Sequence, residues 1–391
     1  MKRVVFAICA LCVMLCSCES GFERELKGVL EDAKARYGAY AVEVEQDNRC
    51  FPYAFSSGEM LPAEGDKMWA CGYFPGSLWL LAEWSEDEAL RETAHVLTRK
   101  IDRMPASKNI HDMAMILNVA HYNGYRQIGG QRLWESMDMV ARVSSNSFSA
   151  LYCTIPRDEN EPDWYQKVGI WNLPTLEFLY ELGWKGNVMV HAQKTIEYQM
   201  NENGAANEAM VFNRFTFEGE KPFSLHGQSA ESAWSRGQAW ALYGFAMLHR
   251  KSEDKLLLEQ AEKCAEYILS HLPEDGIPNW DFDSADELKD SSAAAIMASA
   301  FIDLYNQTGK QEYLDTAKKV ANYFITNCAS DWIPRCDFRQ PAEPDLKDNA
   351  AGAIASCGLL ELGRLGDEDV EDFFRAGVNI LKAQHPEYEF W

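Results

Sequence analysis

The chain has 391 residues, of which 47% are hydrophobic and 12% aromatic, which is ample for a large core. Its formal net charge of −23 repels phosphate backbones, so nucleic acid is a poor candidate partner. The sequence contains no P-loop, no dinucleotide-binding glycine motif and no HExxH motif, and we expect neither a cofactor nor a metal.

The first predicted element is a leader of the lipoprotein type. Two basic residues precede an apolar segment over residues 4–15, and the sequence LCSC ends at Cys18. A charged start followed by an apolar run too short for a membrane span is typical of a secretory signal. LCSC is similar to a bacterial lipobox, so we expect removal of residues 1–17 and lipid on Cys18. The protein would then be a membrane-anchored lipoprotein of the periplasm or cell surface; a plain secretory signal is the alternative.

The remaining chain, residues 18–391, is predicted to be one mostly helical domain. Apolar residues recur three and four apart in segments such as AWALYGFAMLHR and LLLEQAEKCAEYILSHL, which is the helical period. Convincing strands are nearly absent, so we expect no sheet beyond a short hairpin. The cysteines after the leader are scattered and form no CxxC pair, which indicates neither a zinc site nor a disulfide framework.

Next along the chain, the stretch NIHDMAMILNVAHYNGYR places a charged pair at the head of an apolar helix. His111 and Asp112 form this pair. An aspartate in this position is either an ordinary helix N-cap or an active-site carboxylate. The residues alone leave both interpretations open.

A repeat occupies the C-terminal part of the chain. IPNWDF begins at Ile277 and IPRCDF at Ile333, and each is followed by LKD and a small-residue helix. Asp290 and Asp348, the aspartates of the two LKD segments, are well placed as helix N-caps. A helix–loop–helix unit of this length fits the mature chain about six times. We therefore predict an all-α fold, the (α/α)6 toroid.

Aromatic side chains gather in the loops and at the predicted starts of the inner helices. Flat apolar rings beside Asp, His, Arg and Gln side chains suit sugars, which have C–H faces and a hydroxyl rim. The alternative is that most of these rings pack in the core. They are Trp69, Tyr73, Phe74, Trp79, Trp164, Trp171, Trp234, Trp240, Trp280 and Trp332.

The motifs WACGYFPGSLW, HDMAM, ESAWSRGQAWALYGF and LPEDGIPNWDFD, the last followed by KDSSAAAIMASA, resemble those of unsaturated glucuronyl hydrolases, glycoside hydrolase family 88. They occur in family order from Trp69 to Asp303. The resemblance implies the (α/α)6 fold and a uronic-acid-containing oligosaccharide as the partner. We expect the substrate-binding residues to converge with Asp112 on one mouth of the ring. They are Trp69, His111, Trp171, His226, Arg236, Gln238 and Trp240.

The resemblance also implies a reaction. The family hydrates the C4=C5 enol ether of a 4,5-unsaturated uronic acid left by polysaccharide lyases, and the hemiketal collapses to release the sugar. One characteristic aspartate lies in an HD motif and maps to Asp112, which favours a catalytic carboxylate over a cap. Arg236 is the best cation for the substrate carboxylate, with a structural salt bridge to a loop acid as the alternative.

The second characteristic aspartate has no counterpart. WYQKVGIWNLPTLEFL aligns with the family without gaps, and Trp171 occupies the position of the general acid/base. An indole neither protonates a carbon nor deprotonates a water at neutral pH. The family's histidine in the next loop falls near Met210, and Ala114 replaces a usual glycine.

Three hypotheses follow. The protein is a divergent glycoside hydrolase that uses Asp112 and a replacement acid, with Asp163, Glu161 and Glu231 as candidates; or it acts on a related sugar by chemistry rebuilt around Trp171. In the third hypothesis it is a surface lipoprotein that binds uronate-bearing oligosaccharides without turnover. We favour a hydrolase.

Overall fold

Most of the chain is placed by the computed structural model. Three predicted features lie outside the described residues: the leader with Cys18, the pair His111 and Asp112, and the candidate acid Asp163. The described residues are 21–46, 51–56, 59–102, 116–146, 154–155, 161–162, 164–213, 215–216, 218–285, 288–328, 330–338, 347–365 and 370–384.

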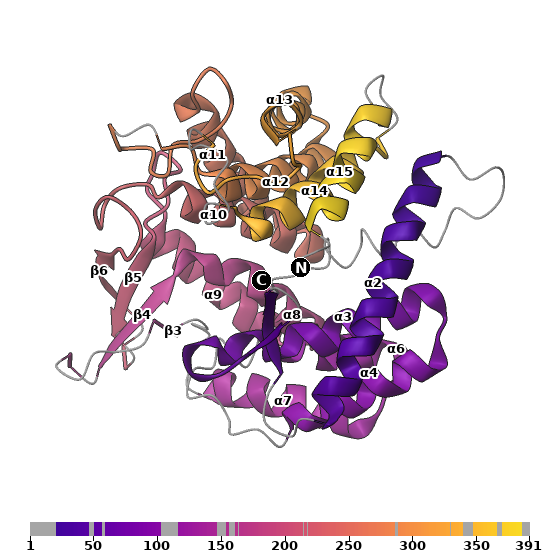
Figure 1. Cartoon of the computed structure of the whole chain (residues 1–391). Helices are drawn as coiled ribbons and strands as arrows, with labels where there is room; N and C mark the ends of the chain where they lie inside the picture. Colours follow the sequence, from indigo (N-terminus) through magenta and orange to yellow (C-terminus); the bar gives the residue numbers. More distant parts are fainter. Residues whose placement is uncertain are drawn as a thin grey trace.

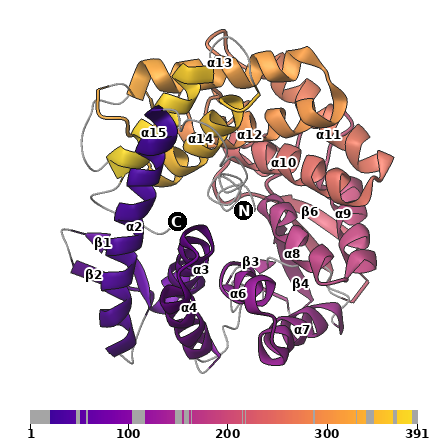
Figure 2. The ribbon, with the colours of Figure 1, turned by 90° about the vertical axis from the view of Figure 1, so that its right-hand side faces the viewer.

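Helical hairpins follow one another around a ring, which is seen along its opening in Figure 2 and from the side in Figure 1. The prediction of an (α/α)6 toroid is confirmed. Among the described helices, none is long and apolar enough to span a membrane. The inner helices are α3 (Tyr73–Ser85), α6 (His121–Ile128), α8 (Leu176–Glu181), α10 (Ser235–Ser252), α12 (Ser291–Thr308) and α14 (Asn349–Leu362). The outer helices are α4 (Glu88–Ile101), α7 (Gln131–Asn146), α9 (Lys185–Gln199), α11 (Lys255–His271), α13 (Gln311–Cys328) and α15 (Val370–Gln384), and α2 (Gly21–Gln46) packs between α15 and α3.

Burial distinguishes the inner from the outer helices. In α12 every residue from Ser291 to Leu304 is buried, and the sequence SSAAAIMASA is rich in small residues that let α10 and α14 approach from both sides. Outer helix α11 instead buries one stripe, which includes Leu257, Ala261 and Cys264. Such a three- and four-residue spacing is what a helix with one solvent-exposed face requires.

Two predicted helix caps are present. The Asp290 carboxylate accepts a hydrogen bond from the Ala293 amide at 2.8 Å, and Asp348 accepts one from Ala351 at 2.8 Å. Each side chain thus satisfies one of the amides that a helix start leaves without a partner. Both predictions are confirmed, and the repeated LKD segments mark the starts of α12 and α14.

Short backbone bridges join the loops that precede consecutive inner helices. Trp234 pairs with Asp281, and Asp290 pairs with Asp337. Asp281 and Asp337 are the equivalent aspartates of the two repeats. The starts of α10, α12 and α14 are therefore held side by side at one mouth of the ring.

The expectation of no sheet beyond a short hairpin is wrong. A two-stranded sheet, β1 (Pro52–Ser56) with β2 (Glu59–Pro62), is accompanied by a four-stranded antiparallel sheet of order β3-β4-β5-β6. These strands have at most five residues, too few for a period-two pattern to be distinctive. The strands of the larger sheet are β3 (Thr154–Ile155), β4 (Tyr165–Gly169), β5 (Ala209–Asn213) and β6 (Gly219–Phe223).

Candidate active site

Trp171 lies on a 3-10 segment, η3 (Ile170–Thr175), directly after β4. The next residue, Asn172, is fully buried, and its Nδ2 lies 3.0 Å from Nε2 of the buried His191. Leu173 packs so closely on α10 that a Cβ at Gly244 would lie 2.3 Å from the leucine Cβ. This buried anchoring fixes the backbone of η3 and so positions the half-buried Trp171.

The Trp171 side chain belongs to a compact group from three separate parts of the chain. Its ring lies edge-on to His226 at 6.1 Å and to Trp234 at 6.2 Å between centroids. The His226 imidazole stacks on the Trp234 indole at 4.8 Å with an interplanar angle of 22°. The Arg236 guanidinium carbon lies 5.2 Å from the centre of the same indole. We call Trp171, His226, Trp234 and Arg236 the Trp171 cluster.

A buried carboxylate holds His226 in place. Glu208 is 1% exposed and lies just before β5. Its Oε1 lies 2.6 Å from Nδ1 of His226, and its Oε2 accepts the backbone N–H groups of Leu225, His226 and Gly227 at 2.9, 2.9 and 3.0 Å. Burial alone raises the pKa of Glu208, but hydrogen bonds from His226, from Ser224 and from the loop backbone outweigh it and lower the pKa to about 2.

Arg236 is already paired. Its Nη2 donates to the Asp290 carboxylate at 3.0 Å, so the partner is the N-cap of α12. The arginine side chain nevertheless keeps 42% of its surface exposed. A guanidinium has five N–H donors, so the exposed part can still bind a carboxylate.

Gln238, a predicted substrate-binding residue, has its side chain hydrogen-bonded within the fold. The side chain is fully buried; its Nε2 donates to the Gly204 carbonyl at 2.8 Å, and its Oε1 accepts from the Ala206 amide at 2.7 Å. Successive helical residues are about 100° apart, so Gln238, two positions after Arg236, points to the opposite side of α10. Its role is to fasten α10 to the loop before β5.

The two other predicted tryptophans lie outside the Trp171 cluster as defined above. Trp240 is half-buried on α10, meets the Tyr243 ring edge-on at 6.1 Å and packs against the main core. Trp69 is half-buried in the 3-10 segment η2 (Gly65–Gly72) on another hairpin, with the Tyr73 ring edge-on at 5.9 Å. The structure therefore brings together three of the predicted residues, Trp171, His226 and Arg236.

Of the two candidate replacement acids that the structure describes, one is paired with a lysine and the other is exposed. Glu161 forms an ion pair with Lys167 at 2.9 Å, and Glu231 is an exposed loop residue. Two residues of the site, Trp234 and Glu208, were not among the predicted substrate-binding residues, although Trp234 was named among the aromatic side chains at the predicted helix starts. Trp234 belongs to the WSRGQAW motif and could have been included, but nothing local marks Glu208, because its partners are amides of a loop further along the chain.

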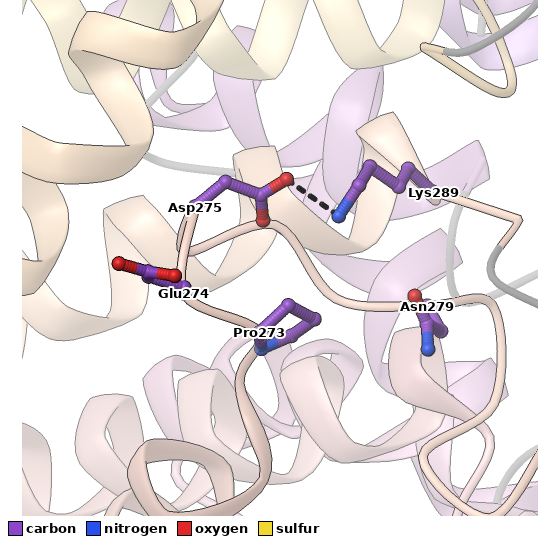
Figure 3. Close-up of a pocket in the computed structure, with 5 residues that line it drawn as sticks. All are labelled: Pro273, Glu274, Asp275, Asn279 and Lys289. Carbon is purple, nitrogen blue, oxygen red and sulfur yellow. Dashed lines mark ion pairs between the residues drawn. The ribbon is translucent and has the colours of Figure 1, made fainter.

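A separate hollow of about 470 Å³ lies in the loop between α11 and α12 (Figure 3). Among the described residues that line it, the one cation is Lys289, which forms an ion pair with Asp275 at 2.6 Å, and Glu274 adds a second carboxylate. A net negative lining suits an anionic sugar poorly. The Trp171 cluster, with its arginine, is the better candidate.

Comparisons with known proteins agree with this assignment of the fold. No protein-family model matches the chain. The unsaturated glucuronyl hydrolase of Formosa agariphila is 28% identical over 289 residues, which cover 70% of this chain and 72% of that one. The namesake enzyme of Bacillus sp. strain GL1 is 25% identical over 288 residues, or 68% and 76% of the two chains. A crystal structure of an unsaturated glucuronyl hydrolase specific for heparin covers 89% of this chain and 99% of its own, with 25% identity and a TM-score of 0.65. The chain resembles the unsaturated glucuronyl hydrolases in sequence and in fold.

From the sequence alignment, Trp171 is predicted to occupy the family's proton-transfer position. The segment from Trp164 to Leu176, which holds Trp171, contains no Asp or Glu at all, so no shift of the alignment within it restores an acid. Met210, near which the alignment predicted the family's histidine, is 6% exposed and packs with Val168 and Phe212 in the sheet. This segment therefore supplies no carboxylate for proton transfer.

Proposed function

We propose that the protein is a glycoside hydrolase that removes a terminal 4,5-unsaturated uronic acid from oligosaccharides produced by polysaccharide lyases. The observation that carries the proposal is the Trp171 cluster, which presents an imidazole and a guanidinium against indole rings at the starts of inner helices. Indole faces accept sugar C–H groups, and the free donors of Arg236 suit the uronate carboxylate. The resemblance to known hydrolases supports the same reaction class.

The reaction is the addition of water to an enol ether. A proton adds to C4 while the C4=C5 π electrons form the new C–H bond, and water adds to C5 and gives up a proton. The hemiketal then opens and the attached sugar leaves. By resemblance Asp112 is a carboxylate of the site, where it orients a hydroxyl or handles a proton.

One alternative has a specific observation in its favour. The absence of any acid between Trp164 and Leu176 also suits a protein that binds uronate-bearing oligosaccharides without turnover. Either function fits our further proposal that lipid on Cys18 anchors the protein at the periplasmic or cell-surface side of a membrane.

Turnover of lyase-generated disaccharides separates the two functions. We expect the enol-ether absorbance to fall on incubation with the protein, and Asp112→Asn to abolish this loss while binding and the free energy of unfolding stay nearly unchanged. Asp315→Asn, on the exposed face of α13, is the matched control and should retain full activity. Binding by the parent protein without loss of absorbance would establish the non-catalytic alternative.

Restoring an acid at the altered position is a second test. If Trp171 has replaced the acid in an otherwise inherited site, Trp171→Asp raises hydrolysis of the unsaturated uronate. Trp171→Phe removes the indole without adding a carboxylate and is the control. Equal activities of the two variants would argue that position 171 no longer faces the reacting carbon.

A further inference from the structure

We propose that His226, held by Glu208, is the proton-transfer residue of this site and performs the role for which Trp171 is chemically unsuited. This inference rests on the proposed hydrolase function. It makes His226 a catalytic residue and Glu208 a positioning residue.

Of the two ring nitrogens of His226, only Nε2 can take part in proton transfer. Nδ1 of His226 lies 2.6 Å from the Glu208 carboxylate, which is ionised and can only accept a hydrogen bond. Nδ1 therefore carries a hydrogen, and Nε2 is the nitrogen that can accept or donate a proton. Nε2 has no partner among the described residues, and the His226 side chain is 54% exposed.

The ring is also held rigidly, as proton transfer requires. Glu208 accepts the backbone amide of His226 as well as its side chain, so one buried carboxylate fixes both. The Trp234 indole supports one face of the imidazole, and the Trp171 indole meets it edge-on. An imidazole base that is oriented by a carboxylate is a recurring arrangement for general acid–base catalysis.

The charged groups around the imidazole come from three elements. Glu208 precedes β5, Arg236 on α10 lies over the Trp234 indole, and Asp281 accepts the Gln228 amide beneath the loop. Arg236 is paired with Asp290, and Asp281 is committed to the loop, where it also accepts the Ser232 hydroxyl. Glu208 is thus the charged group in direct contact with the ring.

A single imidazole can account for both proton movements of the hydration. In the imidazolium form Nε2–H gives its proton to C4, as the π electrons of C4=C5 become the C4–H bond and C5 becomes electron-deficient. Neutral Nε2 then accepts the proton of the water whose oxygen bonds to C5. The imidazolium is regenerated, and the net change is the addition of one water.

The test compares His226 with another exposed, ring-stacked histidine. His271 stacks on Tyr267 at 4.1 Å on outer helix α11, and among the described residues its ring contacts are with Tyr267 and Phe282, not with the Trp171 cluster. With lyase-generated disaccharides as substrate, His226→Gln is expected to lower kcat roughly 100- to 10,000-fold, with KM changed only a few-fold, because general acid–base catalysis has this magnitude. His271→Gln should match the parent.

Chemical rescue separates a catalytic from a structural role. Added imidazole should restore part of the kcat of His226→Ala, since the deleted side chain was half-exposed and leaves room for the free base. A His226→Ala protein that loses activity through a raised KM, without rescue, would identify a binding contact and overturn the inference. So would a His226→Gln protein that keeps kcat within about threefold of an active parent; the proposed hydrolase function would then still stand. A parent that binds the disaccharide but never hydrates it overturns the proposed function, and this inference with it.

Glu208 is tested through the tautomer of the imidazole. In Glu208→Gln the amide oxygen can serve the three loop amides, and the NH₂ group then faces Nδ1 and forces the hydrogen onto Nε2. The ¹⁵N chemical shifts of His226, assigned with His226→Gln, should show this exchange, and kcat should fall while Glu208→Asp retains more activity. An unchanged tautomer in Glu208→Gln would remove the positioning role from Glu208.

Discussion

His191 should make the fold sensitive to mild acid. It lies on α9 behind the Trp171 segment, is 1% exposed, and faces the Asn172 amide through Nε2. The Thr175 hydroxyl donates to Asn172 Oδ1 at 2.9 Å, so the Asn172 NH₂ group must donate to the imidazole. A proton on His191 Nε2 would place two hydrogen-bond donors, the Asn172 NH₂ group and the Nε2–H group, opposite each other in a buried site. Burial lowers the pKa of His191 to about 3, from its ordinary value of 6.5.

The sign and size of the change in the free energy of unfolding with pH follow from the difference between the folded-state and unfolded-state pKa values of His191. Because the folded-state pKa lies below that of the unfolded chain, the unfolded state binds the extra proton between these values, and the free energy of unfolding falls as the pH falls through 6.5. The full loss approaches about 5 kcal/mol near pH 3, and about 2 kcal/mol of it is reached by pH 5. Carboxylates contribute little above pH 5, because their ordinary pKa values lie lower.

Urea unfolding at pH 7 and pH 5 measures this loss. His191→Gln retains an acceptor for Asn172 but cannot titrate, so it is the matched control for the pH dependence. We expect the parent to lose about 2 kcal/mol more than His191→Gln between the two pH values. Equal losses in the two proteins would refute the reasoning that His191 is buried in its neutral form.

Three further variants test single contacts. Asp290→Ala removes the α12 cap and the partner of Arg236 and should lower the free energy of unfolding by about 2–4 kcal/mol in urea unfolding, whereas Asp290→Asn keeps the cap and should lose less. Gly169→Ala places a Cβ 2.4 Å from the Trp171 indole, at a backbone φ of −85° that any residue can adopt. We expect the free energy of unfolding to fall by about 1–3 kcal/mol and the tryptophan fluorescence to change. An unchanged spectrum would mean that the indole moves aside without cost. Cys18→Ala should release the protein from membranes on fractionation, and continued sedimentation with membranes would contradict the lipobox interpretation.

Local signals explain what could be predicted from the sequence. Asp290 and Asp348 cap their helices because a carboxylate before a small-residue helix needs only the next three residues to act. The (α/α)6 ring could also be predicted, because the repeat gives the length of one helical hairpin and about six such units fit the chain. The four-stranded sheet could not be predicted, because its strands are short and β4 pairs with β5, which lies about 40 residues further along the chain.

At the candidate site, helix geometry and separation along the chain determine which residues could be predicted from the sequence. Arg236 joins the Trp171 cluster while Gln238 is buried, a difference that the 100° step of an α-helix would have predicted from the same WSRGQAW motif. Glu208 carries no such signal, since its importance depends on a loop that folds back from residues 224–227. Sequence motifs identify the side chains of the mouth more readily than the groups that orient them.

The backbone bridges at the mouth also bear on amide hydrogen exchange. The Phe282 amide donates to the Ala233 carbonyl at 2.9 Å, and the Phe338 amide donates to the Lys289 carbonyl at 3.3 Å, so three successive hairpins share hydrogen bonds across their loops. Segments tied in this way open together rather than one by one. The protected amides of Phe282 and Phe338 should therefore exchange with a common opening free energy, and a sugar bound against the α10 loop should slow exchange two hairpins away.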